Sequence, residues 1–260
     1  MQEKFNLNCN IEQDSWQDWL RQPAAHYIRA WEQSQLDKLT CDIFGFNAVQ
    51  IGMPHMDCLA GSRMPNQWLT NTELLANPAR KITLLHDLED LPFDTQSLDL
   101  VVLPHVLEFA AEPHQILREV ERVLIPEGRL IICGFNSASL WGARQAVGKL
   151  SGHHFLPRSG EFISLPRLKD WLKLLNMEVD RGHFGCYAPP INNPNWLQRF
   201  QFIEQAGQRW WPYLGAAYIL HAVKRVRGMH LIGPVWKNKK IRVPNVVPVT
   251  NRHHPQPKTK

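Results

Sequence analysis

The chain has 260 residues, a size that suits one large domain with appendages. Its 44% hydrophobic and 20% charged residues and its net charge of +5 are ordinary for a globular protein. Its five cysteines are scattered without a C-x-x-C pair, which argues against a disulfide framework and a cysteine-based zinc site. The polar start predicts no signal peptide, and the uncharged residues 210–223 are too few for a membrane span of roughly 20, so we expect a cytoplasmic protein.

The first half of the chain is expected to form a helical cap followed by alternating strands and helices. Residues 1–45 are expected to be helical, with Tyr27, Ile28 and Trp31 on one face. Continuous apolar runs predict the strands, and Pro113 is expected as the first residue of an amphipathic helix. The expected strands are residues 47–51, 81–87, 97–105 and 129–135, the helix is residues 112–124, and residues 125–128 form a turn.

The second half continues the alternation of helices and strands. Helical periodicity predicts helices over residues 165–175 and 193–211, and apolar runs predict strands over residues 178–187 and 216–226. Strands that are apolar throughout, with helices between them, are typical of a parallel sheet covered on both faces. The sequence therefore predicts an α/β fold.

The end of the chain is strongly basic. Residues 205–260 hold eleven Lys and Arg and no Asp or Glu, whereas the remainder holds 18 basic and 24 acidic residues. Residues 227–260 contain several prolines and little periodicity, which predicts a disordered tail. Such a tail can hold nucleic acid or an anionic surface by charge, or it can serve only solubility, and both interpretations stay open.

The segment over residues 82–136 carries a set of motifs in a fixed order. Asp87 is followed by L-P-F at residues 91–93, by L-D-L-V at 98–101 and by P-E-G at 126–128. In this order and spacing the segment resembles the class I S-adenosylmethionine-dependent methyltransferases, and most closely the type 11 group, which includes quinone-biosynthesis methyltransferases. The chain as a whole is similar to a bacterial subgroup of that group whose substrate is not known.

The resemblance implies a Rossmann-like sheet of seven strands, six parallel and one antiparallel, with helices on both faces. The cofactor is then expected at the carboxyl ends of the first strands, as in open α/β sheets generally. The expected organisation is a helical cap over residues 1–45, a methyltransferase-like domain over 46–226 with its core motifs in 47–136, and the basic tail over 227–260.

The resemblance also implies which residues bind S-adenosylmethionine. Asp87 is expected to accept a hydrogen bond from the adenine amino group, and the backbone N–H of Leu88 to meet the ring. A helix N-cap or turn residue is the alternative role for Asp87. Family spacing from Gly52 places Glu73 at the ribose hydroxyls, and an ordinary surface carboxylate is the alternative there.

The cofactor loop departs most from the family pattern. Family members read V-L-D/E-L-G-x-G-x-G, whereas this chain has V-Q-I-G-M-P-H, so Gln50 replaces the usual acid and Gly52 is the one glycine kept. Glycines at such a turn permit a positive φ and close approach of the backbone, and a proline removes an N–H. We expect Gln50, Gly52 and Met53 to hold the methionine end of the cofactor, with altered binding.

His105, at the end of the fourth strand, is the candidate catalytic residue. Its position predicts that it faces the cofactor pocket and acts as a general base, or that it only lines the pocket. The histidines show no metal-ligand spacing, so we expect no metal site.

Two functions from different classes remain open. The first is a methyltransferase that acts on an unidentified acceptor, either a small molecule or RNA, held by the N-terminal helix and residues 137–211. The second is a catalytically degenerate methyltransferase fold that serves as an interaction module and binds nucleic acid through residues 205–260. The missing glycines and the basic end motivate the second hypothesis.

Overall fold

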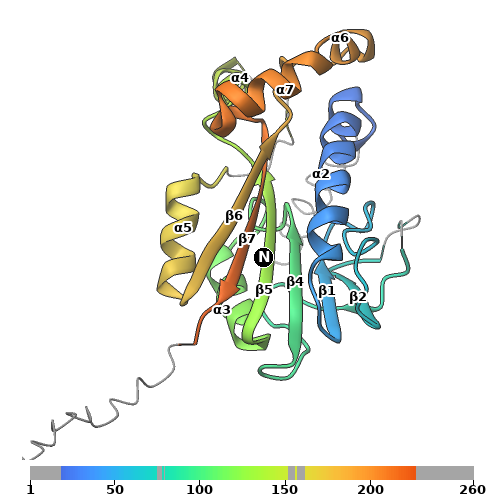
Figure 1. Ribbon diagram of the computed structural model, residues 1–260, viewed down its shortest axis with the longest axis vertical. Coiled ribbons are helices and arrows are strands. Elements are labelled where there is room, and N and C mark those ends of the chain that lie inside the picture. The colour runs from blue at the N-terminus through green and yellow to red at the C-terminus, as the bar shows by residue number, and fades with distance from the viewer. Residues whose placement is uncertain (1–18, 75–77, 79, 152–155, 157–161, 227–260) are drawn as a thin grey trace, which may run out of the picture. The chain divides into compact units, whose positions relative to one another are not determined.

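The fold is built on a twisted seven-stranded sheet (Figure 1). The structure is a computed structural model that describes residues 19–74, 78, 80–151, 156 and 162–226. The strand order is β3-β2-β1-β4-β5-β7-β6. The strands are β1 (Asn47–Ile51), β2 (Asn66–Asn71), β3 (Leu84–Leu85), β4 (Leu98–Pro104), β5 (Leu124–Phe135), β6 (Met177–Gly185) and β7 (Ala217–Lys224).

Six strands run parallel and β7 runs against them. β1 pairs in parallel with β2 and β4, β2 with β3 and β4 with β5, whereas β7 is antiparallel to both β5 and β6. The predicted Rossmann-like sheet with one antiparallel strand is therefore confirmed.

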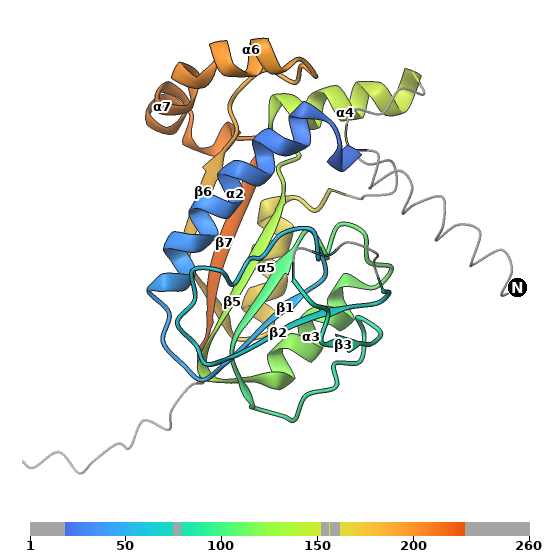
Figure 2. The same cartoon turned by 90° about the vertical axis from the view of Figure 1, so that its right-hand side faces the viewer.

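Helices cover both faces of the sheet, as predicted (Figure 2). On one face, α2 (Pro23–Cys41) packs its buried Ile28 and Leu36 in a core with Ile131 of β5 and Ile219 of β7. On the other face, α3 (Pro113–Val123) and α5 (Leu165–Leu174) pack against the alternate residues of the same strands. The central strands β1, β4 and β7 and the second half of β5 thus bury both of their faces, which explains why these strands read as continuous apolar runs.

α3 is the helix that the sequence predicts best. It begins at Pro113, whose fixed φ suits the first turn, and its apolar positions are all buried against the sheet. The turn predicted at residues 125–128 lies within β5 as a bulge, because Leu98 pairs with Leu124 while Leu100 already pairs with Arg129.

Other predicted elements differ from the structure. β2 has little apolar pattern, since only Leu69 and Thr70 of its six residues are buried, and the strand predicted over 81–87 is reduced to the exposed Leu84–Leu85. The helix predicted over 193–211 is two helices, α6 (Pro194–Arg199) and α7 (Gln201–Trp210).

The elements beyond the core motifs gather at the carboxyl edge of the parallel strands, the edge where each parallel strand ends. α4 (Leu140–Ser151), which the periodicity did not predict, follows β5. α6, α7 and the short 3-10 helix η1 (Pro212–Leu214) connect the carboxyl end of β6 to the start of β7, and Figure 1 shows them above the sheet. The additional helices therefore lie at the edge where the resemblance places the cofactor.

The predicted division into domains stays a prediction. α2 packs into the main core rather than forming a unit of its own. Contacts divide the chain into Met1–Val226 and Arg227–Lys260, and the tail predicted over 227–260 lies outside the described residues, as do residues 1–18 of the predicted cap. Within the described part, no helix is long and apolar enough to cross a membrane.

Candidate functional site

The loop after β1 turns sharply at Gly52. Its φ is +77°, and Met53 follows with φ +46°. The N–H of Gly52 donates to the carbonyl oxygen of Thr70 in β2 at 2.8 Å. A Cβ at Gly52 would lie 2.9 Å from the Cγ2 of Val106, so both the backbone angle and the neighbouring side chain require glycine here.

The buried side chain of Gln50 is hydrogen-bonded to the backbone of this loop. Its side chain is 1% exposed, and its Oε1 accepts the N–H of Cys58 at 2.8 Å. Its Nε2 donates to the carbonyl oxygens of Gly52 and Met53 at 3.1 Å each, and to that of Met56 at 2.8 Å. The amide is thus fully used by the loop, and the Cys58 N–H fixes which end of the amide carries the oxygen.

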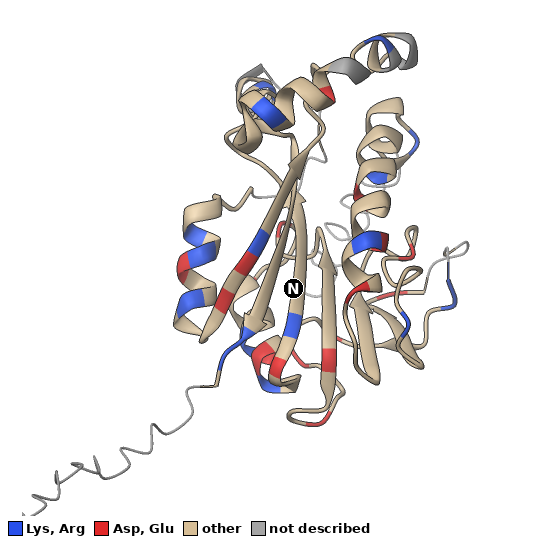
Figure 3. Cartoon of the chain, viewed as in Figure 1, with Lys and Arg blue, Asp and Glu red and all other residues tan. Residues whose placement is uncertain are grey.

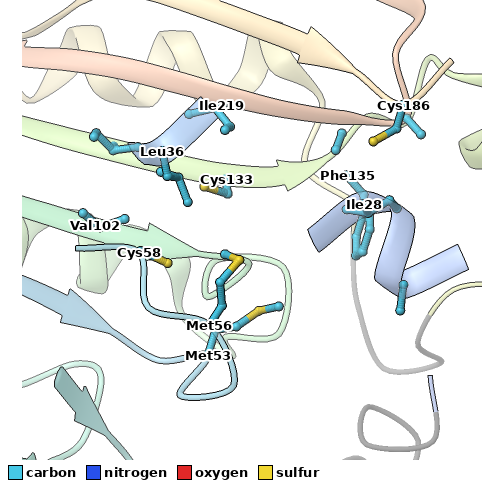
Figure 4. Packing of buried hydrophobic residues seen from close by; sticks show 14 of the residues in the cluster. Ile28, Leu36, Met53, Met56, Cys58, Val102, Cys133, Phe135, Cys186 and Ile219 are labelled. Carbon is cyan, nitrogen blue, oxygen red and sulfur yellow. The ribbon is translucent and has the colours of Figure 1, made fainter. Parts of the chain in front are cut away.

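Two methionines pack within the altered loop, and Met56 stands where the family has its third glycine. Met53 is 7% exposed and Met56 is 3% exposed, and both belong to the core beneath α2. Figure 4 shows their side chains close together beside Cys58. The loop therefore keeps its shape through one glycine, the buried amide and thioether packing, rather than through a run of glycines.

Three titratable side chains meet at the carboxyl end of β4. His105 has φ +54° and is 3% exposed. Its Nε2 lies 2.8 Å from Oε1 of Glu32 in α2, and its Nδ1 lies 3.0 Å from Oε2 of Glu108. Glu108 also accepts the backbone N–H of Phe135 at the end of β5. The cluster thus ties α2, β4 and β5 together in the interior.

This environment keeps the His105 ring protonated. Burial lowers the pKa of His105, but the charge of Glu32 and the hydrogen bonds with Glu108 and Glu32 outweigh it and raise the pKa to about 10. Burial raises the pKa of Glu108, partly offset by its hydrogen bond with His105. At neutral pH the ring therefore carries a proton on each nitrogen and has no free lone pair with which to act as a base.

Two members of this cluster were not predicted as site residues. Glu32 lies four residues from Ile28 and four from Leu36, so it interrupts the buried stripe of α2 with an acid. That position was the available signal, because buried carboxylates need a partner. Glu108 lies three residues after His105, a spacing that by itself indicates no contact outside a helix.

Asp87 lies directly after β3 and is exposed. No helix begins at Asp87 in the described residues, so it is not a helix N-cap; its carbonyl accepts the N–H of Asp90 at 3.2 Å in a turn. Leu88 is half-buried beside it. The carboxylate of Asp87 thus stands at the carboxyl end of the third strand, as the family pattern implies.

Two polar residues, Asn71 and Glu73, lie at or just beyond the end of β2. Glu73 is exposed and lies two residues beyond the strand, where its carbonyl accepts the Nδ2 of Asn71 at 2.7 Å. Ile51 pairs with Thr70, so Asn71 is level with Gly52. Asn71, which the sequence pattern did not indicate, therefore lies next to the loop after β1, and the role of Glu73 stays a prediction.

Two buried polar atoms in this region lack a hydrogen-bond partner among the described residues. They are Oε2 of Glu32 and Nε2 of His86. His86 precedes Asp87, and Glu32 contacts His105. A bound polar ligand would supply the missing hydrogen-bond partners of the buried Glu32 oxygen and the His86 ring nitrogen. In the described ranges, no three His, Cys, Asp or Glu side chains gather as metal ligands.

Comparisons with known proteins bear on the fold and the family of the chain. The family described as "Methyltransferase domain" matches residues 64–132. The uncharacterized protein YafS of Escherichia coli K12 is 31% identical over 171 residues, which cover 65% of this chain and 67% of YafS. A demethylmenaquinone methyltransferase of Clavibacter sepedonicus is 41% identical over 58 residues, which cover 22% of this chain and 24% of that enzyme.

A solved structure shows the same fold. The crystal structure of an S-adenosylmethionine-dependent methyltransferase from Thermotoga maritima superimposes with a TM-score of 0.58 at 16% identity, over 82% of this chain and 96% of that one. The seven-stranded order and the matched domain agree with one another. The chain belongs to the class I S-adenosylmethionine-dependent methyltransferases and is a methyltransferase.

Proposed function

We propose that this protein transfers the methyl group of S-adenosylmethionine to a small-molecule acceptor in the cytoplasm. S-adenosylmethionine supplies a methyl group that is already activated on a sulfonium. The chain therefore has to bind the cofactor and the acceptor, orient them and exclude water. The observation that carries the proposal is the loop at Gly52, which remains intact although two family glycines are missing. The degenerate binding module is not favoured, because the methyltransferase domain matches through residues 64–132.

At the methionine end, we assign the acid of the site to Glu32. Gln50 stands where the family has an acid, but its amide is used by the loop. The buried Oε2 of Glu32 lacks a donor, and an ammonium group is a donor of the matching charge. Gly52 and Met53 would contribute backbone atoms, and Gln50 would act as a positioning residue through the loop.

At the adenosine end, the residues fit a nucleoside. Asp87 would accept from the adenine amino group, and the N–H of Leu88 would meet the ring. The unpartnered Nε2 of His86 adds a polar group beside them. For the ribose hydroxyls, Glu73 remains the proposed acceptor, with Asn71 as a second group level with Gly52.

His105 would line the reaction centre as a positioning residue. Both its nitrogens already contact buried carboxylates, so a proton released by the acceptor has to go elsewhere. The proposed acceptor pocket comprises α2 and residues 137–211, of which α4, α6 and α7 lie at the carboxyl edge of the sheet.

Replacing Asp87 with alanine is expected to weaken binding of S-adenosylhomocysteine about ten- to a hundredfold. A hydrogen bond to a charged group contributes about 1.5–3 kcal/mol, and each tenfold in affinity is about 1.4 kcal/mol. Because Asp87 is exposed, folding is expected to be unchanged. Isothermal titration calorimetry measures the change.

Asp94→Ala is the matched control for this substitution. Asp94 is an exposed acid in the same connection between β3 and β4, and Ser97 contacts it only through its backbone carbonyl. The Asp94→Ala protein should bind S-adenosylhomocysteine with the affinity of the unaltered protein. Equal affinities for Asp87→Ala and Asp94→Ala would remove Asp87 from the cofactor site.

A further inference from the structure

An exposed aromatic surface lies where α7 ends and η1 follows. We call it the aromatic rim; its members are Trp210, Trp211, Tyr213 and Leu214. They are 69%, 52%, 70% and 47% exposed. The two indole rings lie 5.9 Å apart in an edge-to-face arrangement. Four adjacent large apolar side chains in water are costly to keep, so such a surface indicates an interaction site.

The backbone holds these side chains outward. The N–H of Trp211 donates to Gly207 at 2.8 Å, and the hydroxyl of Tyr187 donates to the carbonyl of Pro212 at 2.7 Å. Asn136 Nδ2 donates to the carbonyl of Tyr213 at 2.8 Å. The turn is thus anchored to the sheet by polar contacts, and the exposure of its aromatic side chains is built into the fold.

The charges beside the rim are positive. Arg209 is exposed next to Trp210, and on α6 the guanidinium of Arg199 lies 5.9 Å from the ring of Trp196, which is itself 45% exposed. Glu204, the single acid of α6, α7 and η1, turns inward and accepts the backbone N–H of Tyr187 at 2.8 Å. The basic residues of these helices are Arg199 and Arg209, so their outward charge is positive (Figure 3).

We propose that the aromatic rim docks on an anionic lipid bilayer. Tryptophan and tyrosine prefer the boundary between acyl chains and headgroups, and nearby arginines attract anionic lipids. Two arginines among large apolar rings match a lipid surface, whereas nucleic acid calls for a denser array of basic groups. The docking is peripheral: the rim inserts only to the depth of its side chains.

The rim lies on the same edge of the sheet as the proposed cofactor site, because α6, α7 and η1 join the carboxyl end of β6 to β7. This position has a consequence that rests on the proposed function: an acceptor dissolved in the bilayer would reach the site from the docked edge. The acceptor class is then a lipid-soluble molecule.

Co-sedimentation with vesicles tests the docking, using the full chain without cofactor so that the result is independent of methyl transfer. Vesicles of phosphatidylcholine with one quarter phosphatidylglycerol are compared with phosphatidylcholine alone. We expect the protein to pellet with the anionic vesicles, and the double variant Trp210→Ser, Trp211→Ser to partition at least tenfold less. Both rings are exposed, so its thermal unfolding should match that of the unaltered protein.

Phe44→Ser, Phe46→Ser is the matched control, since these two aromatic residues are 78% and 72% exposed at the opposite edge, before β1. This control variant should pellet with the anionic vesicles to the same extent as the unaltered protein. Absence of pelleting, pelleting that survives loss of both tryptophans, or an equal loss in the control would each overturn the proposal. Dimerisation through the rim or RNA binding by the rim, without binding to vesicles, would also overturn the proposal. Calorimetry with S-adenosylhomocysteine separately decides the proposed function.

Discussion

Changing Gln50 to glutamate is expected to destabilise the protein and to weaken cofactor binding, although family members carry an acid at this position. The Nε2 of Gln50 donates to three backbone carbonyl oxygens. A glutamate would place a buried carboxylate oxygen against the same three acceptors, with no donor between them. Unsatisfied buried groups cost about 1–3 kcal/mol each, and more when charged, so we expect a loss of at least about 3 kcal/mol.

Urea unfolding measures the loss, and calorimetry with S-adenosylhomocysteine measures the binding. Gln67→Glu makes the same chemical change at a half-buried residue, whose Nε2 donates to the carbonyls of Ser62 and Met64 and whose Oε1 accepts from Arg80 at 2.8 Å. Because the new charge there lies beside a guanidinium and is partly exposed to solvent, its cost should be smaller than at Gln50. A Gln50→Glu protein with an unchanged urea midpoint and tighter binding would contradict the role given to the amide.

Changing Glu32 to glutamine is expected to lower the pKa of His105 and to destabilise the protein by about 3 kcal/mol, within the range for breaking a buried charge pair. The substitution keeps the shape and an acceptor oxygen but removes the charge that, with Glu108, holds the proton on the ring. Glu178→Gln, an exposed acid that contacts Arg225, is the control and should cost less than about 1 kcal/mol.

The same cluster predicts how stability depends on pH. The pKa of His105 is about 10 in the folded protein and near the ordinary value of 6.5 when unfolded. The stabilisation is therefore complete below pH 6.5 and is lost as the pH rises through 10, at up to about 1.4 kcal/mol per pH unit. The raised pKa of Glu108 acts with the same sign, at lower pH.

Urea midpoints between pH 6.5 and 10 measure this dependence, and the ring signals of His105 in NMR titration give its pKa directly. Glu32→Gln should flatten the dependence over that interval. An equal slope in the unaltered protein and in Glu32→Gln would show that the cluster does not hold the proton.

The sheet was predictable where one local rule decides the structure. β4, α3 and the apolar part of β5 have continuous apolar runs or a helical period, and Pro113 marks the helix start. β2 escaped the same rule because most of its side chains are polar or half-buried, and its place is set by pairing with β1. The break between α6 and α7 likewise has no signal in the periodicity of residues 193–211.

The site was predictable in outline and not in its chemistry. The motif order located Asp87 and Gly52 at strand ends, because carboxyl ends of parallel strands share one edge. The use of Gln50 depends on three carbonyls folded back over it, and the protonation of His105 depends on Glu32, 73 residues away. Contacts of that kind have no signature in spacing, although an acid in the buried stripe of α2 marked one of the partners.

The altered loop is expected to bind the cofactor across the ends of β1 and β3. Hydrogen exchange with and without S-adenosylhomocysteine tests it most directly, because it reports both binding and place. We expect slower exchange in residues 50–58 and 84–91, with residues 165–174 of α5 unchanged. No slowing at millimolar ligand, or slowing confined to other segments, would contradict the account.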